Sequence, residues 1–110
     1  MRLTYAIKYV ADMDRAIAFH RDVLGLAVKF QSPFWTEFDT GGTTLALHPL
    51  TGDHRAGEVQ LGFAVPDLEG FYAAREEKGL DFTMPPTAQF GRTLARFRDS
   101  EGAETTVSQA

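Results

Sequence analysis

The stretch that decides the fold is "KYVADMDRAIAFHRDVLGL", residues 8–26. It opens on the end of a segment rich in β-branched and aromatic residues, which is typical of a strand. Asp12 follows, and its carboxylate can accept hydrogen bonds from the free amides of a first helical turn. Apolar side chains then recur at three- and four-residue spacing, and Gly25 suits the left-handed residue that ends a helix. The stretch therefore predicts a strand that leads directly into one amphipathic helix over 13–24.

A similar phrase returns as "FAVPDLEGFYAAREEKGL", residues 63–80. The positions that match in order along the two copies are Val10 and Val65, Asp12 and Asp67, Gly25 and Gly79, Asp39 and Asp99, and Gly42 and Gly102. The repeat is longer than the unit of a solenoid, so it indicates one duplicated domain rather than an array.

Each copy predicts one strand, one helix and three further strands. In the first copy the expected strands are 3–10, 26–31, 34–40 and 43–48. In the second they are 58–65, 80–84, 92–98 and 103–109, with a helix after Asp67 and a strand end at Pro85-Pro86. We therefore predict a single α+β domain over 1–110, built from two βαβββ modules over about 3–48 and 58–109 with the linker 49–57.

Composition excludes several classes of protein. The chain has 110 residues, which suffices for one domain, and a net charge of −4, which argues against nucleic-acid binding. It contains no cysteine, so thiolate ligands and a cysteine nucleophile are excluded. No apolar run approaches the roughly 20 residues that span a bilayer, and the start does not resemble a secretory signal. We expect a cytoplasmic protein that binds neither nucleic acid nor membrane.

The segments "VADMDRAIAFHRDVLGL", "FDTGGTTLALHP" and "FRDSEGAETTVSQ" together resemble the vicinal oxygen chelate superfamily over about residues 3–109. This group includes glyoxalase I, bleomycin-resistance proteins and extradiol dioxygenases. The resemblance implies a bacterial protein in which two modules form a curved mixed sheet around a cavity. It also implies that enzymatic members hold a divalent metal with His, Gln and Glu, leaving coordination positions open for substrate. His20 stands where the family usually has Tyr.

The family's four metal-ligand positions can be carried over onto this chain. They fall on Tyr5, Ala46, Gln60 and Thr106, so neither a histidine nor a carboxylate stands at any of them. We therefore expect no metal cofactor and expect these four side chains to line a ligand site. A divalent metal would need a displaced set, for which the candidates are His48, Gln60 and Glu104, because side chains two apart on a strand share a face.

Other side chains are candidates for the same site. Trp35 is either a core residue or a platform for a planar ligand, and the sequence leaves its face open. Arg96 shares a strand face with Arg92 and Arg98. These arginines indicate either a face exposed to solvent or at the rim of a dimer interface, or a wall of the site that attracts anions.

The three histidines have different expected roles. His48 is the first candidate for acid–base catalysis, with Tyr5 as the second, because imidazole titrates near neutral pH. His20 is expected in the core, and His54 is expected in solvent on the linker.

Several functions remain open on the sequence. The first is a metal-free homodimeric protein that binds or sequesters a small, partly aromatic molecule. It is favoured because the sequence pattern of the fold is intact, whereas the family's metal ligands are missing. The second is a metal-dependent lyase, isomerase or dioxygenase with a rearranged site that uses His48, Gln60 and either Glu104 or Glu37. The third is a metal-free enzyme that transfers a proton through Tyr5 or His48. The fourth is a structural or partner-binding module whose cavity is filled by side chains.

Overall fold

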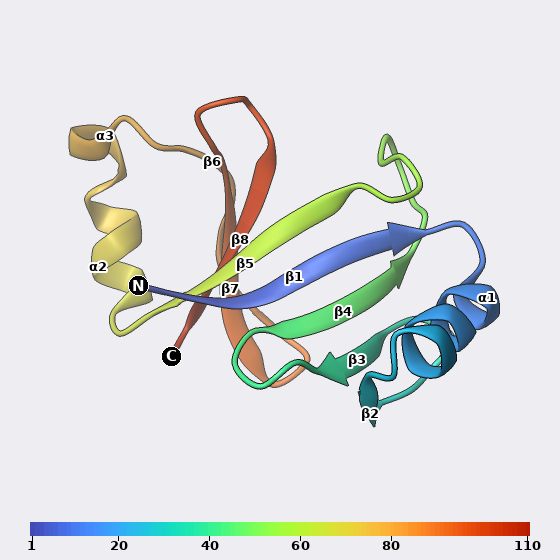
Figure 1. Cartoon of the computed structure of the whole chain (residues 1–110). Coiled ribbons are helices and arrows are strands. Elements are labelled where there is room, and N and C mark those ends of the chain that lie inside the picture. Colours follow the sequence, from blue (N-terminus) through green and yellow to red (C-terminus); the bar gives the residue numbers. More distant parts are fainter. The chain divides into compact units, whose positions relative to one another are not determined.

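The computed structural model describes all 110 residues and confirms the α+β fold of two βαβββ modules (Figure 1). The chain divides into two compact units: residues 4–59 form one, and residues 60–110 with 1–3 form the other. They are called the first and second modules below, with the whole of β1 (Arg2–Val10) described with the first and the whole of β5 (Val59–Val65) with the second.

The first module contains β1 (Arg2–Val10), α1 (Met13–Ala18), a π-helical turn (Phe19–Val23), β2 (Ala27–Phe30), β3 (Thr36–Asp39) and β4 (Thr44–Pro49). Its strand order is β2-β3-β4-β1, with β1 parallel to β4 and the other pairs antiparallel. The helix packs on one face of this sheet, where Ile17 meets Phe38 and Leu47 in a buried cluster. The opposite face of the sheet carries the side chains of the candidate site.

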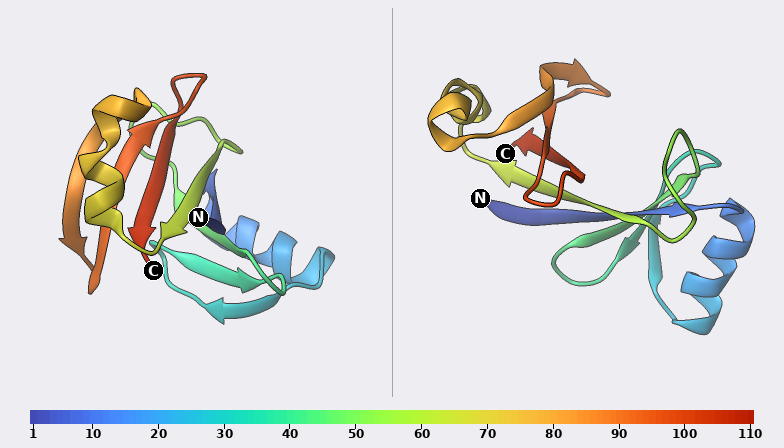
Figure 2. Two further views of the ribbon diagram at one scale, coloured as in Figure 1. Left: turned by 90° about the vertical axis from the view of Figure 1, so that its left-hand side faces the viewer. Right: turned by 90° about the horizontal axis from the view of Figure 1, so that it is seen from above.

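The second module repeats this plan. It contains β5 (Val59–Val65), α2 (Leu68–Ala73), α3 (Arg75–Lys78), β6 (Asp81–Gln89), β7 (Arg92–Arg98) and β8 (Glu104–Gln109). Its strand order is β5-β8-β7-β6, again with one parallel pair, β5 with β8. Figure 2 shows α2 lying across this sheet, and Leu68 packs there against Phe97 and Val107.

The repeat predicted from the sequence is visible in local geometry. Asp12 Oδ1 accepts a hydrogen bond from the Arg15 amide at 3.1 Å, and Asp67 Oδ1 accepts one from the Gly70 amide at 3.0 Å. Both residues are helix N-caps, as expected. Gly79 ends α3 in the left-handed conformation, with φ of 68°, which glycine adopts without steric cost.

Two expectations about element limits are wrong. The strand expected to end before Pro85-Pro86 continues through both prolines to Gln89. β6 is the edge strand of its module's sheet, and its register against β7 shifts on both sides of Met84. An edge strand with such irregular pairing tolerates proline, because few of its amides are needed for hydrogen bonds to a neighbouring strand. The single helix expected over 13–24 is α-helical only to Ala18 and then π-helical.

The π-helical turn coincides with a side-chain bond to the backbone. His20 Nδ1 donates to the Ala16 carbonyl at 2.7 Å, the acceptor that a regular α-helix assigns to the His20 amide. The Leu24 amide bonds to the Phe19 carbonyl five residues back, at 3.1 Å.

Candidate functional site

The face of the first module opposite α1 is defined by strand register. Tyr5, Ile7 and Tyr9 of β1 lie beside Thr44, Ala46 and His48 of β4. Glu37 of β3 lies beside Ala46 on the other side. Since cross-strand neighbours point to the same face, Tyr5, Ala46 and His48 are brought together as the sequence predicted.

Glu37 is the centre of the polar contacts on this face. Trp35 Nε1 donates to Glu37 Oε2 at 2.8 Å, and Tyr5 Oη donates to the same oxygen at 3.3 Å. The Tyr5–Glu37 bond runs from β1 to β3 and therefore crosses β4, near the fully buried Ala46. Trp35 thus lies on the face with Glu37 rather than in the core against α1, so the structure assigns the face that the sequence left open.

His48 adds a third ring beside Trp35. The Trp35 and His48 ring centroids are 6.2 Å apart and the rings are nearly perpendicular, at 83°. The Tyr9 ring centroid also lies 5.2 Å from that of His48. His48 Nδ1 lies 2.7 Å from the Pro49 carbonyl oxygen. Because a carbonyl can only accept, Nδ1 carries the proton of this bond, and Nε2 is the acceptor nitrogen of the neutral ring.

The linker folds back onto the same strand, contrary to the expectation that His54 is solvated. The His54 ring stacks on Tyr9 at 3.8 Å with an angle of 9°, and its Nδ1 contacts Glu58 Oε2. The Gly57 amide also donates to the Tyr9 carbonyl at 2.7 Å. The linker is therefore packed against β1, and Tyr9 lies between two imidazoles.

The second module places its predicted residues on the face away from α2. Gln60 Nε2 donates to Thr106 Oγ1 at 2.8 Å, so two of the four carried-over positions bond to each other. Arg96 lies opposite Thr106 on β7 and is half-buried, and its guanidinium has neither a hydrogen bond nor an ion pair. Glu104 shares this face but accepts a bond from Thr83 Oγ1 at 2.7 Å.

The remaining arginines on that strand differ from Arg96. Arg98 is exposed, donates to the Gly102 carbonyl at 3.1 Å and lies 3.9 Å from Asp81. Arg92 is exposed at the other end of β7.

A divalent metal does not fit the residues present. The carried-over positions offer a phenol, a methyl group, an amide and a hydroxyl, whereas hard divalent ions take imidazole and carboxylate ligands. No group of three or more His, Cys, Asp or Glu side chains in the chain could hold a metal ion. Of the displaced candidates, Glu104 accepts a hydrogen bond from Thr83. We therefore derive no chemistry through a metal.

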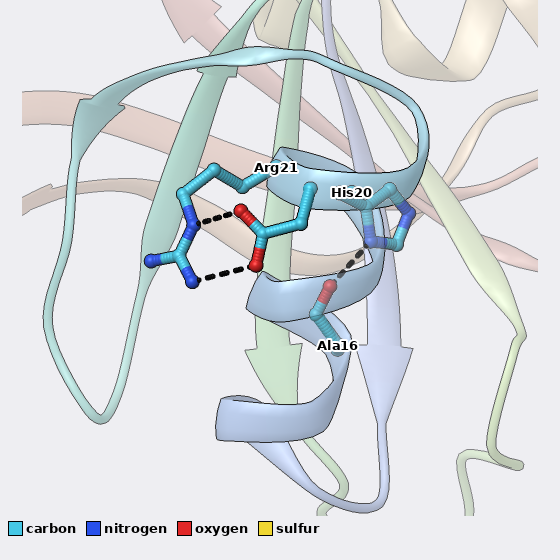
Figure 3. Close-up of polar contacts among 4 residues, drawn as sticks. Ala16, His20 and Arg21 are labelled. Carbon is cyan, nitrogen blue, oxygen red and sulfur yellow. Dashed lines mark hydrogen bonds and ion pairs between the residues drawn. The ribbon is translucent and has the colours of Figure 1, made fainter.

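The helical residues near the π turn have structural contacts (Figure 3). His20 is buried, as predicted for a core histidine, and its Nδ1 bond to Ala16 satisfies it. Arg21 donates from Nε and Nη2 to both carboxylate oxygens of Asp22, at 2.8 and 2.9 Å. These hydrogen bonds hold the pKa of Asp22 below its usual value and raise that of Arg21, but both groups are exposed.

Sequence reasoning found most of these residues and undervalued two. Glu37 was only an alternative metal ligand, although its period-two spacing from Trp35 places both on one face. Tyr9 was missed, and the same spacing from Tyr5 would have indicated it. Neither spacing shows that Tyr5 reaches Glu37 across an intervening strand.

Comparisons with known proteins agree with this fold. The Glyoxalase/Bleomycin resistance protein/Dioxygenase superfamily matches residues 2–107. The chain is similar to YurT of Bacillus subtilis, an uncharacterized protein, with 29% identity covering 93% of this chain and 94% of that protein.

Solved structures share the fold at low identity. A methylmalonyl-CoA epimerase of Streptomyces coelicolor, in complex with 2-nitronate-propionyl-CoA, has a TM-score of 0.79 at 17% identity, covering 100% of this chain and 94% of that one. A hypothetical protein of Bacillus halodurans has a TM-score of 0.82 at 12% identity, covering 99% and 94%. No helix is long and apolar enough to cross a membrane. The chain belongs to the Glyoxalase/Bleomycin resistance protein/Dioxygenase superfamily.

Proposed function

We propose that the chain is a metal-free protein that binds or sequesters a small, planar, partly aromatic molecule. The observation that carries the proposal is the linkage of Tyr5, Glu37 and Trp35 across the first module's face, where enzymatic relatives would need metal ligands. Aromatic walls with a few fixed polar groups are typical of small-molecule sites. Trp35 and His48 supply the wall, and Glu37 supplies the fixed polar group.

Metal binding is the first test. Protein purified without chelator or nickel affinity resin would be assayed for metal content and titrated with Mn²⁺, Fe²⁺, Ni²⁺ and Zn²⁺. We expect no stoichiometric metal at high micromolar concentration. A tight metal at one per chain that is lost in His48→Ala would overturn the proposal in favour of a metal-dependent enzyme with a displaced site.

Ligand binding is the second test. A panel of planar aromatic compounds would be screened by ligand-observed NMR, and the compounds that bind would be retested on Trp35→Leu. We expect this variant to lose binding, because the indole forms the wall and donates to Glu37. Phe34→Leu is the matched control, since Phe34 is the next residue along the chain and is 77% exposed. Equal loss in both variants, or no binding by any compound, would contradict the proposal.

A second candidate function rests on the hydrogen bond of His48. With Nδ1 donating to Pro49, Nε2 can accept a proton, so a metal-free proton transfer at an activated carbon is chemically available. The test is solvent deuterium uptake at the carbon next to a carbonyl, followed by ¹H NMR over a panel of carbonyl compounds. Uptake that is abolished in His48→Ala would favour the enzyme, and no uptake in the wild type would exclude it for that panel.

Arg96 is proposed to contribute an anion-binding position on the second module. Its guanidinium is half-buried without an ion pair, which is unfavourable unless an anion is bound. Phosphate titration followed by NMR should shift the amides around Arg96 in the wild type and not in Arg96→Gln. An unchanged titration in that variant would remove Arg96 from the site.

We also propose a homodimer. β2 is the edge strand of the first module's sheet, and all four of its residues are exposed. Phe30 is 53% exposed and Phe34 77% exposed, and exposed apolar side chains at a sheet edge favour association. Light scattering should give twice the 12.2 kDa chain mass, and Phe30→Lys should shift it toward the monomer. A monomeric wild type would refute the assignment.

A further inference from the structure

Glu37 carries a charge that nothing in the protein neutralises. Its side chain is half-buried, and its two hydrogen-bond donors, Tyr5 Oη and Trp35 Nε1, are both neutral. None of the three ion pairs in the chain involves it. The nearest cation by strand register is Lys29 on β2, and its Nζ donates to Thr44 Oγ1 at 3.0 Å instead. A partly desolvated carboxylate without a counter-charge favours a positively charged partner.

The two donors also leave one oxygen available. Both bonds go to Oε2, so Oε1 has no partner within the protein. Because two neutral groups hold the carboxylate from one side, its orientation is fixed before any ligand arrives. A group that donates to Oε1 therefore meets a preoriented acceptor, which reduces the entropy lost on binding.

The rings around Glu37 suit the same kind of partner. Tyr5 and Trp35 lie 6.0 Å apart at 57°, so neither ring stacks flat on the other. The electron-rich faces of Trp and Tyr attract cations within about 6 Å of the ring centroid. A planar cation can thus contact an aromatic face while its N–H groups reach the carboxylate.

We propose that the first module's site selects planar ligands that carry a cationic nitrogen group, such as an amidinium or guanidinium, which donates to Glu37 Oε1. The inference rests on the proposed function, because it names the chemical class of the ligand bound at the same face. It excludes ligands with a carboxylate in that position, since two carboxylates would face each other.

The test uses three isosteric probes that differ in charge: benzamidine, benzamide and benzoate. Trp35 is the chain's one tryptophan and lies on the first module's face, so its fluorescence reports binding beside Glu37. At pH 7 we expect benzamidine to bind at least about tenfold more tightly than benzamide. Hydrogen bonds to charged groups are stronger than neutral ones by a free energy that corresponds to about this ratio of dissociation constants. Benzoate should be the weakest of the three.

Glu37→Gln separates charge from shape. The amide keeps an acceptor oxygen and nearly the same volume, so we expect the preference for benzamidine over benzamide to fall to about twofold or less. Glu104→Gln is the matched control, because it removes one negative charge from the second module and should leave the preference unchanged. Tyr5→Phe removes one donor but no charge, and it should retain the preference even if Glu37→Gln alters local packing.

The outcomes distinguish the two claims. Equal binding of benzamidine and benzamide by the wild type, or an undiminished preference in Glu37→Gln, would overturn the charge selection and leave the binding function intact. If Glu37→Gln and Glu104→Gln reduce the preference for benzamidine equally, then the preference reflects the net charge of the protein rather than Glu37. That outcome would also overturn the inference. If none of the three probes binds, the proposed function fails together with this inference.

Discussion

The same substitution at two repeat-equivalent positions should have different consequences. Ala46 and Thr106 are equivalent positions of the repeat, 60 residues apart in the chain. Each lies on the last strand of its module. Ala46 is fully buried, with Ile7 on one side and Glu37 on the other. Glutamate is the residue that the family's metal site would have at both positions, so Ala46→Glu and Thr106→Glu form a natural pair of variants.

Ala46→Glu should destabilise the protein strongly. A longer side chain in a filled position costs about 1–3 kcal/mol. Its carboxylate would also lie directly opposite Glu37, and like charges in that arrangement cost up to about 1 kcal/mol more. We therefore expect the free energy of unfolding to fall by about 2–4 kcal/mol.

Thr106→Glu should be tolerated. It removes the Thr106 hydroxyl that accepts from Gln60, a bond worth about 1 kcal/mol. The new carboxylate can accept from the same amide, and it lies opposite Arg96, where a cross-strand ion pair contributes about 0.2–1 kcal/mol. We expect the free energy of unfolding to change by less than about 1 kcal/mol.

The assay is urea unfolding followed by far-UV circular dichroism and by Trp35 fluorescence, in the presence of EDTA so that adventitious metal cannot stabilise the new carboxylates. Ala46→Ser is the control for polarity without bulk, and it should lose less than Ala46→Glu. If both glutamate variants lose the same stability, then Ala46 is not enclosed by the Tyr5–Glu37 bond and the account of the first module's face is wrong.

Three further predictions concern the helices. Asp12→Ala and Asp67→Ala should each lower the free energy of unfolding by about 1 kcal/mol in urea titrations, because each removes a helix N-cap. A loss of stability in only one variant would mean that the two caps are not equivalent. Gly70→Ala should fail to give the usual gain of about 1 kcal/mol for replacing a helical glycine, because its Cβ would lie 2.3 Å from Oδ2 of the capping residue Asp67. A full gain in the free energy of unfolding would show that the Asp67 side chain moves aside while it keeps the cap. Arg21→Gln should raise the pKa of Asp22 in a carboxyl NMR titration, since the Arg21 hydrogen bonds lower it, and an unmoved midpoint would show that the pair does not persist in solution.

The sequence was sufficient wherever the structure depends on neighbours along the chain. The caps at Asp12 and Asp67 and the left-handed Gly25, with φ of 75°, are local features, and all three were predicted correctly. The shared face of Ala46 and His48 follows from strand periodicity alone. The continuation of β6 through its prolines could not be predicted, because it depends on β6 being an edge strand, and strand order is a property of the assembled sheet.

The contact between Tyr5 and Glu37 could not be predicted from the sequence for the same reason. Tyr5 and Glu37 are 32 residues apart and lie on strands that are not adjacent, since β4 runs between them. Their contact requires the parallel pairing of β1 with β4 and a small residue at position 46, and only the first of these is implied by the fold. Alternation placed Trp35 with Glu37, but their joint face could be assigned only after the register of β3 against β4 was known.

The candidate-site faces of the two modules differ in the charged group that each holds without a counter-charge. In the first, the carboxylate of Glu37 is held by neutral donors and keeps its charge available, so an organic cation is the partner that its chemistry favours. In the second, the unpaired guanidinium of Arg96 stands opposite Thr106, and a positive charge there opposes any divalent cation. If the proposed function holds, the Glu37 face and the Arg96 position would therefore bind oppositely charged groups of small organic molecules.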